Sequence, residues 1–215
     1  MTALTLLLLV AAQPTDEARF AKWEKEIAGI EKRLHARPPK KDGVIFVGSS
    51  SIRLWKLDQS FPDMHYTNVG FGGSEIRDCT HFAPRLIAPY HPRAIVFYAG
   101  DNDISSGRKA EQVVADFKTF AAAVHKTDPR CRILYLPVKP SIARWGKFPE
   151  QAKANKLVKE YCDKSGPTFG YIDTVPAMLG EDGKPIPALF AKDGLHMSPA
   201  GYEKWTALVK AALEK

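Results

Sequence analysis

Short apolar runs that alternate with helical segments constrain the fold of this chain more than any other feature. The runs are rich in β-branched residues and cover residues 44–47, 64–69, 94–99, 133–136 and 169–172. Such short apolar runs are typical of buried parallel strands. Between and after them, apolar residues recur at helical spacing over residues 76–88, 110–125, 151–165 and 200–213. The alternation predicts βαβ units, and therefore a three-layer α/β/α sandwich around a parallel sheet of about five strands.

Two further helical signals flank this pattern. Apolar residues at three- and four-residue spacing predict one amphipathic helix over residues 16–35, which ends before Pro38 and Pro39. Ser198 followed by Pro199 is typical of the start of a helix, with serine as the N-cap and proline in the first turn. The length of 215 residues suits one domain, which we expect over residues 13–215.

The first twelve residues are interpreted as the apolar part of an export signal. Residues 4–12 are almost all apolar and end in Val10-Ala11-Ala12, which resembles a small-residue cleavage site. The run is too short to span a bilayer, which needs about 20 apolar residues. No Lys or Arg precedes it, so an uncleaved apolar tail on a cytoplasmic protein is the alternative.

Composition excludes several classes of protein. Hydrophobic residues make up 45% and charged residues 26% of the chain, which is typical of a globular domain and not of a disordered one. The formal net charge is +7, but the most basic stretch, residues 31–41, has no interleaved aromatic residues. We interpret that stretch as a solvated connector, and a nucleic-acid partner is not expected.

The metal-binding residue types are scattered. Cys79, Cys131 and Cys162 are too few and too widely spaced for a disulfide framework or a zinc site. The sequence does not exclude a single disulfide bond between two of them. The six histidines show no H-E-x-x-H motif and no pair at i, i+4 spacing. Neither a metal nor another cofactor is therefore expected.

Unusual polar clusters follow four of the predicted strands. They are Gly48-Ser49-Ser50-Ser51, Gly70-Phe71-Gly72-Gly73, Gly100-Asp101-Asn102-Asp103 and, beyond the fifth strand, Asp193-Gly194-Leu195-His196. In an open parallel sheet, the carboxyl ends of the strands meet at one edge, so these clusters should converge. Each has an ordinary alternative: a helix cap for the serines, an Asx-turn for Asn102 and a surface histidine for His196.

Together the clusters supply the groups that ester hydrolysis needs. A serine at the start of a helix is a candidate nucleophile, and a carboxylate three residues before His196 could hold Nδ1–H and leave Nε2 as the base. The amide of Asn102 and a bare backbone N–H at Gly72-Gly73 are candidate donors to an oxyanion. The sequence thus offers a nucleophile, a base, a group that orients the base, and oxyanion donors.

With these clusters the chain resembles the SGNH (GDSL-type) hydrolases, whose four conserved sequence blocks appear in order from Val44 to Tyr202. Phe46-Val47-Gly48-Ser49-Ser50, with Trp55 five residues on, is similar to the first block. This resemblance implies that Ser50 is the nucleophile, that Asp193 and His196 complete the triad, and that Ser50, Gly73 and Asn102 form the oxyanion hole. Ser49 departs from the family, which has an aspartate there; we expect this to alter the surroundings of the site and not the mechanism.

The resemblance implies a flavodoxin-like sheet and metal-free ester hydrolysis, and it is greatest to the acetylhydrolase-like branch. We therefore expect a serine esterase for short acyl groups, above all acetyl groups, on small-molecule or carbohydrate esters. The loops at 101–108 and 174–192 lack an apolar lid for a fatty chain, whereas Trp55 and Trp145 suit either stacking on a sugar or core packing. A thioesterase or lysophospholipase, and a non-catalytic carbohydrate-binding protein, are the alternatives. The sequence leaves the natural substrate and the oligomeric state open.

Overall fold

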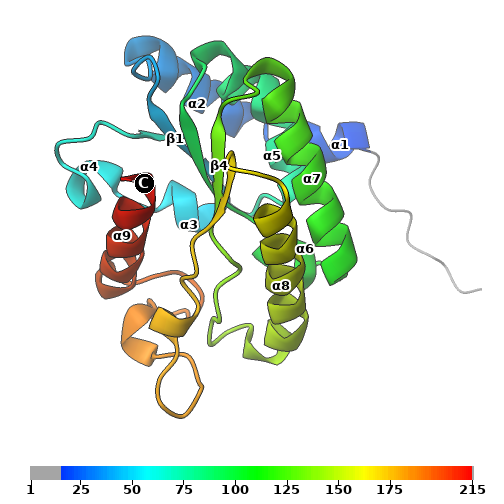
Figure 1. Cartoon of the computed structure of the whole chain (residues 1–215), viewed down its shortest axis with the longest axis vertical. Helices are drawn as coiled ribbons and strands as arrows, with labels where there is room; N and C mark the ends of the chain where they lie inside the picture. Colours follow the sequence, from blue (N-terminus) through cyan, green and yellow to red (C-terminus); the bar gives the residue numbers. More distant parts are fainter. Residues whose placement is uncertain (1–15, 215) are drawn as a thin grey trace, which may run out of the picture.

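A five-stranded parallel sheet forms the centre of the protein, which is described here from a computed structural model covering residues 16–214 (Figure 1). Its strands are β1 (Val44–Gly48), β2 (Thr67–Asn68), β3 (Ala94–Tyr98), β4 (Arg132–Tyr135) and β5 (Phe169–Tyr171). They lie in the order β2-β1-β3-β4-β5, and every neighbouring pair is parallel. This confirms the predicted α/β fold. The interpreted export signal at residues 1–12 lies outside the described residues.

Helices cover both faces of the sheet. One face packs against α2 (Glu24–Ala36), α5 (Ile76–Leu86), α7 (Ala110–Thr127) and α8 (Phe148–Lys164). The other face packs against α9 (Pro199–Leu213) and the short helices α3 (Ser50–Arg53) and α4 (Leu57–Ser60). The remaining helices are α1 (Asp16–Ala21) and α6 (Asp101–Ser105), with short 3₁₀ turns at Ala88–Tyr90, Trp145–Lys147, Pro176–Met178 and Pro187–Leu189.

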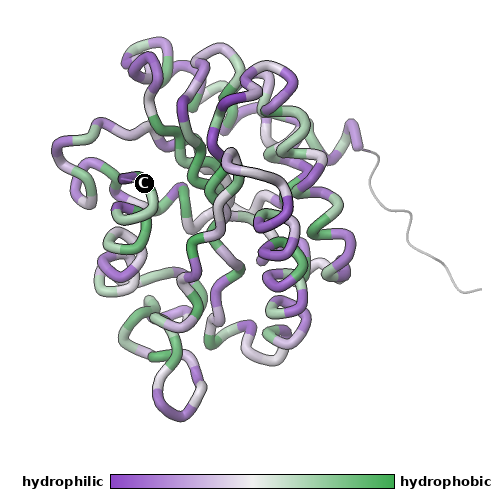
Figure 2. Tube along the Cα trace, in the orientation of Figure 1, coloured by the Kyte–Doolittle hydropathy of each residue, from purple (hydrophilic) through white to green (hydrophobic). Residues whose placement is uncertain are grey.

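The pleat of the strands explains the two cores. Ile45 and Val47 of β1 point into the core under α2, α5, α7 and α8, whereas Val44 and Phe46 point toward α9. Successive side chains of a strand alternate between the faces, and both faces are covered by helices, so all five residues of β1 are buried. Figure 2 shows the result as hydrophobic strands at the centre of a mostly hydrophilic shell.

Two predicted elements differ from the structure. The amphipathic segment 16–35 is divided into α1 and α2, because the chain turns at residues 22–23. The turn lets Phe20 stack on His81 with ring centroids 3.8 Å apart while Trp23 packs edge-on against Phe71. Strand β2 contains only Thr67 and Asn68 of the predicted run 64–69, because the run's start lies at the surface, outside the sheet.

An ion-pair cluster ties α1 to the start of α5. Arg19 donates from Nε and Nη2 to the two carboxylate oxygens of Asp78, at 2.7 and 2.6 Å, and its Nη2 lies 3.1 Å from Glu75 Oε2. Asp78 is fully buried, and Glu75 is the N-cap of α5. Because α5 follows the glycine-rich loop at residues 70–73, α1 is linked to the segment that carries a predicted site residue.

The cysteines are structural. Cys79, Cys131 and Cys162 are all free and buried in the larger core, so no bridge joins them. Within residues 16–214, no helix has the length and apolar character needed to cross a membrane.

Candidate active site

The predicted site residues lie at the carboxyl edge of the sheet because each follows a parallel strand. Ser50 begins α3 directly after β1, and Asn102 lies in α6 directly after β3. Gly73 lies in the loop that follows β2, and Asp193 and His196 lie in the loop that precedes α9. The edge therefore gathers side chains from positions 146 residues apart in the sequence.

Ser50, His196 and Asp193 form a continuous hydrogen-bonded chain. His196 Nε2 lies 3.0 Å from Ser50 Oγ, and His196 Nδ1 lies 2.6 Å from Asp193 Oδ2. A carboxylate can only accept, so Nδ1 carries the hydrogen and Nε2 of the neutral ring is left to accept the serine hydroxyl proton. This is the arrangement of a nucleophile, a base and a group that orients the base.

Backbone donors hold Asp193 in its ionised form. Its Oδ1 accepts hydrogen bonds from the backbone N–H groups of Leu195 and His196, at 2.9 and 3.0 Å. The N–H of Leu195, followed by the His196 ring and the His196 N–H, lowers the pKa of Asp193 to about 2. The side chain is therefore a carboxylate at any pH at which the protein would ordinarily act.

The backbone around the serines presents only Ser50 to the histidine. Gly48 has φ +143°, and a Cβ there would lie 1.9 Å from the carbonyl oxygen of Tyr98, so the sharp turn after β1 needs glycine. Ser49 and Ser51 are buried, whereas Ser50 is partly exposed. The Ser51 hydroxyl is engaged by the ammonium of Lys139 at 3.2 Å.

Two of the predicted oxyanion donors have an N–H group that is free to bind a ligand. Asn102 donates one amide hydrogen from Nδ2 to the carbonyl oxygen of Ser74 at 3.0 Å, which leaves the second hydrogen without a partner among residues 16–214. Gly73 has φ +81° and is exposed, and no hydrogen bond engages its N–H within the described chain. Because a side chain disfavours such a φ, glycine suits this position.

Arg144 fixes which way the Asn102 amide points, a role that sequence reasoning missed. Both terminal nitrogens of its guanidinium lie 3.1 Å from Asn102 Oδ1. A guanidinium only donates, so the amide oxygen must face Arg144 and the NH₂ group must face away from it. The position of Arg144 near a strand end, next to Lys139-Pro140-Ser141, was the only signal in the sequence.

A buried charge network supports Arg144 and the serine turn from behind. Lys139 is almost fully buried and donates to Asp101 Oδ2 at 3.1 Å and to the Tyr98 hydroxyl at 3.0 Å. Arg144 Nη1 and Gln151 Nε2 contact Asp101 Oδ1 at 2.7 and 3.0 Å. Burial raises the pKa of Asp101, but the two neighbouring cations outweigh burial and bring the pKa below its ordinary value. One carboxylate thus faces two cations, which leaves a net positive charge behind the predicted oxyanion hole.

An apolar groove of about 660 Å³ lies beside His196, between the α3–α4 segment and α9. Its lining includes Leu54, Met197, Pro199 and Ala207. The prediction that no apolar segment would cover a fatty chain rested on the two long loops, whereas the groove is built mainly from the α3–α4 segment and α9. Sequence spacing did not show that these two elements face each other.

The tryptophans have different surroundings. Trp55 is only 2% exposed and packs against Phe46 and Trp205, so its ring is a core group and cannot offer a face to a sugar. Trp145 is partly exposed and stacks on Phe148 with ring centroids 4.9 Å apart. Of the two residues proposed for sugar stacking, Trp55 is therefore excluded.

Comparison with protein families places the chain in the GDSL-like lipase/acylhydrolase family, whose model matches residues 51–204. The chain therefore belongs to that family and is a carboxylic ester hydrolase. The match begins one residue after Ser50, so the geometry around His196 is the evidence for that serine. No curated protein matches the chain.

Solved structures share the fold at low sequence identity. A protein from Bacteroides fragilis proposed to be an acylhydrolase has a TM-score of 0.73 and 19% identity, over 94% of this chain and 98% of that one. A GDSL-like lipase from Bacteroides thetaiotaomicron has a TM-score of 0.71 and 20% identity, over 91% and 97%. An acetylxylan esterase from Geobacillus stearothermophilus, solved as a catalytic mutant, has a TM-score of 0.65 and 13% identity, over 80% and 94%.

Proposed function

We propose that the protein is a serine esterase that hydrolyses short acyl esters, with Ser50 as nucleophile, His196 as base and Asp193 as the group that orients it. The observation that carries this proposal is the hydrogen-bonded chain from Ser50 Oγ through both ring nitrogens of His196 to Asp193. A binding module has no need of such a proton relay, so the non-catalytic alternative is disfavoured.

The reaction follows from this geometry. His196 Nε2 removes the hydroxyl proton as Ser50 Oγ attacks the ester carbonyl, and Asp193 stabilises the imidazolium that forms. The same Nε2 then gives the proton to the leaving alcohol oxygen, which leaves an acyl group on Ser50. Water, activated by His196, attacks the acyl-enzyme and releases the acid. The partly exposed site gives water access to this intermediate.

The oxyanion is held by the Ser50 N–H, the Gly73 N–H and the Asn102 amide. Arg144 supports this assignment because it turns the NH₂ group of Asn102 away from itself and leaves one hydrogen free. The net positive charge of the Asp101, Lys139 and Arg144 network favours negative charge at this position. Such donors act mainly when charge develops in the transition state.

A short acyl group on a sugar is the substrate we favour. The groove borders His196, which protonates the leaving oxygen, so the alcohol portion of the substrate can lie in it. The structural likeness to an acetylxylan esterase supports an acetylated carbohydrate as the substrate. The apolar lining of the same groove favours one second candidate, a lipolytic enzyme whose substrate carries a long chain.

Turnover of p-nitrophenyl acetate by wild type and Ser50→Ala tests the proposal. We expect Ser50→Ala to abolish turnover at unchanged melting temperature, whereas Ser49→Ala retains activity. Ser51→Ala should fall between them, because it removes one partner of the buried Lys139. An active Ser50→Ala variant would contradict the assignment of the nucleophile.

Chain length separates the two candidate substrates. We expect kcat/KM on p-nitrophenyl esters of two to sixteen carbons to be highest at two to four carbons. A maximum at eight carbons or more would reject the short-acyl proposal and support the lipolytic alternative.

A further inference from the structure

A second cavity, of about 770 Å³, lies beyond the apolar groove beside His196, where the end of α2 meets α4 and β2. The basic stretch at residues 31–41 contributes Arg33, Arg37 and Lys40 to its lining. Lys56 and His65 join them from the other walls. The stretch that the sequence presented as a solvated connector is therefore one wall of a concave site.

The charge of this basic cavity is strongly unbalanced. Asp58 is the one acidic residue in its lining, and it pairs only distantly with Arg37, at 3.9 Å. Arg37 also donates to His65 Nδ1 at 3.2 Å. The side-chain ammonium groups of Lys40 and Lys56 have no hydrogen-bond or ion-pair partner among residues 16–214, so their charges are free to meet a ligand.

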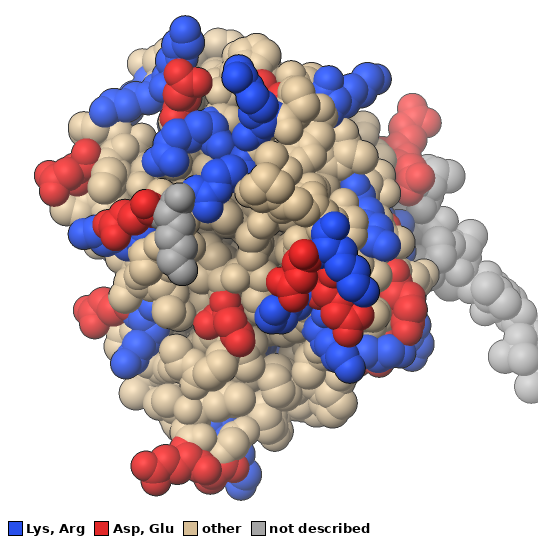
Figure 3. Space-filling view, viewed as in Figure 1, with Lys and Arg blue, Asp and Glu red and all other residues tan. Residues whose placement is uncertain are grey.

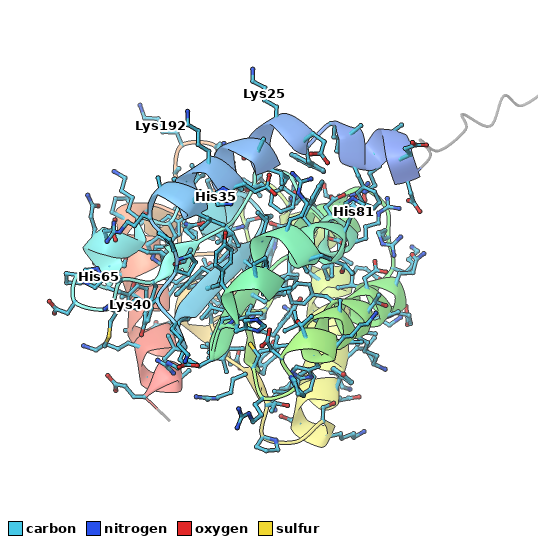
Figure 4. All side chains as sticks on the ribbon, turned by 90° about the horizontal axis from the view of Figure 1, so that it is seen from above. Lys25, His35, Lys40, His65, His81 and Lys192 are labelled. Carbon is cyan, nitrogen blue, oxygen red and sulfur yellow. The ribbon has the colours of Figure 1, made fainter. Side chains whose placement is uncertain are left out.

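The figures show where two residues of the basic cavity lie. Figure 4 shows Lys40 and His65 at the same edge of the molecule, below the end of α2 and beside the α4 region. In Figure 3, Lys and Arg side chains gather over the upper part of the visible face. A concave surface lined by one sign of charge attracts ligands of the opposite sign.

The basic cavity adjoins the apolar groove beside His196. Trp55, Lys56 and Gln59 line both cavities, and His196 lines the groove. The α3–α4 segment is thus a shared wall, with the scissile ester on one side and the unpaired cations on the other. An extended substrate whose leaving alcohol fills the groove can place its next units in the basic cavity.

We propose that the basic cavity is a subsite for a carboxylate-bearing sugar unit, so that the preferred substrates are acetylated acidic polysaccharides. This proposal rests on the esterase function proposed above and names the alcohol portion of its substrate. Arg33 and Arg37 suit a carboxylate because a guanidinium donates in a planar fork, while Lys40 and Lys56 add charge that is less dependent on geometry. A neutral polysaccharide would leave the ammonium groups of Lys40 and Lys56 without an anionic partner.

Charge reversal of Arg37 and Lys40, which line the basic cavity and not the groove beside His196, tests the subsite. The substrates are acetylated polygalacturonate, acetylated xylan as a neutral polymer, and p-nitrophenyl acetate, which is too small to reach the cavity. For Arg37→Glu/Lys40→Glu we expect KM for the acidic polymer to rise about tenfold, with kcat nearly unchanged. The kinetics on xylan and p-nitrophenyl acetate should stay within twofold of wild type.

A matched control separates the local effect from the change in net charge. Lys164 ends α8, which packs beside β5 at the sheet edge opposite β2, and it is exposed. Lys164→Glu, combined with Lys156→Glu at another exposed position of the same helix, makes the same charge change and should leave KM for the acidic polymer within twofold. Added NaCl should raise KM for the acidic polymer in the wild type and much less in Arg37→Glu/Lys40→Glu.

The outcomes are distinguishable. An equal loss on xylan and acidic polymer, an equal effect of the α8 control, or an unchanged KM for acidic polymer would each overturn the subsite. If wild type failed to turn over p-nitrophenyl acetate at all, the esterase proposal itself would fail. Normal turnover of that ester, without any preference for the acidic polymer, would reject only the subsite.

Discussion

Replacing Arg144 by alanine should weaken catalysis by releasing the amide of Asn102. The change removes two 3.1 Å hydrogen bonds to Asn102 Oδ1. A hydrogen bond to a charged group contributes about 1.5–3 kcal/mol. Asn102 keeps its bond to Ser74, and Arg144 is 18% exposed, so solvent replaces part of the loss. We therefore expect kcat to fall about tenfold, equivalent to about 1.4 kcal/mol, against about 10²–10³ for Asn102→Ala.

A double-mutant cycle shows whether Arg144 acts through Asn102. In the Asn102→Ala background, Arg144→Ala should lower kcat by less than about threefold, because the group that it positions is already absent. Arg144→Lys keeps the charge but loses the planar fork, so it should fall between Arg144→Ala and wild type. The readout is kcat on p-nitrophenyl acetate, with KM nearly unchanged.

Two controls test whether the effect of Arg144→Ala is specific. Lys147 is a nearby cation that donates to the carbonyl oxygen of Ser105, and Lys147→Ala should leave kcat within twofold. Asp101 keeps Lys139 and Gln151 as partners when Arg144 is removed, so a large fall in melting temperature is not expected. Equal losses from Arg144→Ala in both backgrounds would show that Arg144 does not act through Asn102 and would refute the argument.

Four further results are expected. Because the pKa of Asp193 is lowered to about 2, protonation of Asp193 should add no step to the pH profile of kcat/KM above pH 3, and a step there that Asp193→Asn removes would argue against this. Burial raises the pKa of Asp103 to about 7, so the folded state holds a proton that the unfolded state loses near pH 4; stability from this source is lost as pH rises from about 4 to 7. The melting temperature of Asp103→Asn relative to wild type should therefore rise from pH 4.5 to 7.5, and a constant difference would contradict this. Burial raises the pKa of Cys131 and Cys162 to about 12, so iodoacetamide at pH 8 should not reduce activity; rapid inactivation would reveal an accessible thiol. Incubation with EDTA should leave the rate unchanged, since no group of three or more ligand-type side chains lies together within residues 16–214, and loss restored by zinc would refute this expectation.

The sheet was predictable from the sequence because its central strands are buried on both faces. Both faces are covered, so each central strand reads as a continuous apolar run, and the runs at β1 and β3 stand out between polar loops. The edge strand β2 was overestimated because Met64 and Tyr66 are apolar without belonging to the sheet. At an edge, apolar side chains pack against loops as readily as against strands.

The convergence of Ser50, Asp193 and His196 was also predictable, since parallel strands bring their carboxyl ends to one edge. The partners of these residues were not. Arg144 reaches Asn102 from 42 positions away, and Lys139 reaches Ser51 from 88 positions away. Such contacts depend on loop paths and on the packing of whole elements, which the spacing of residues does not report.

The Arg19 cluster sets a practical limit on how the chain can be shortened or fused. Deletions that end before residue 19 keep the guanidinium in place, whereas a cut beyond it leaves the fully buried carboxylate of Asp78 without its cation and leaves Glu75 with Arg77 as its ion-pair partner. An unpaired buried charge is far more costly than a missing surface contact. Glu75 is two residues after Gly73. Removal of Arg19 should therefore disturb the loop that carries this predicted oxyanion donor.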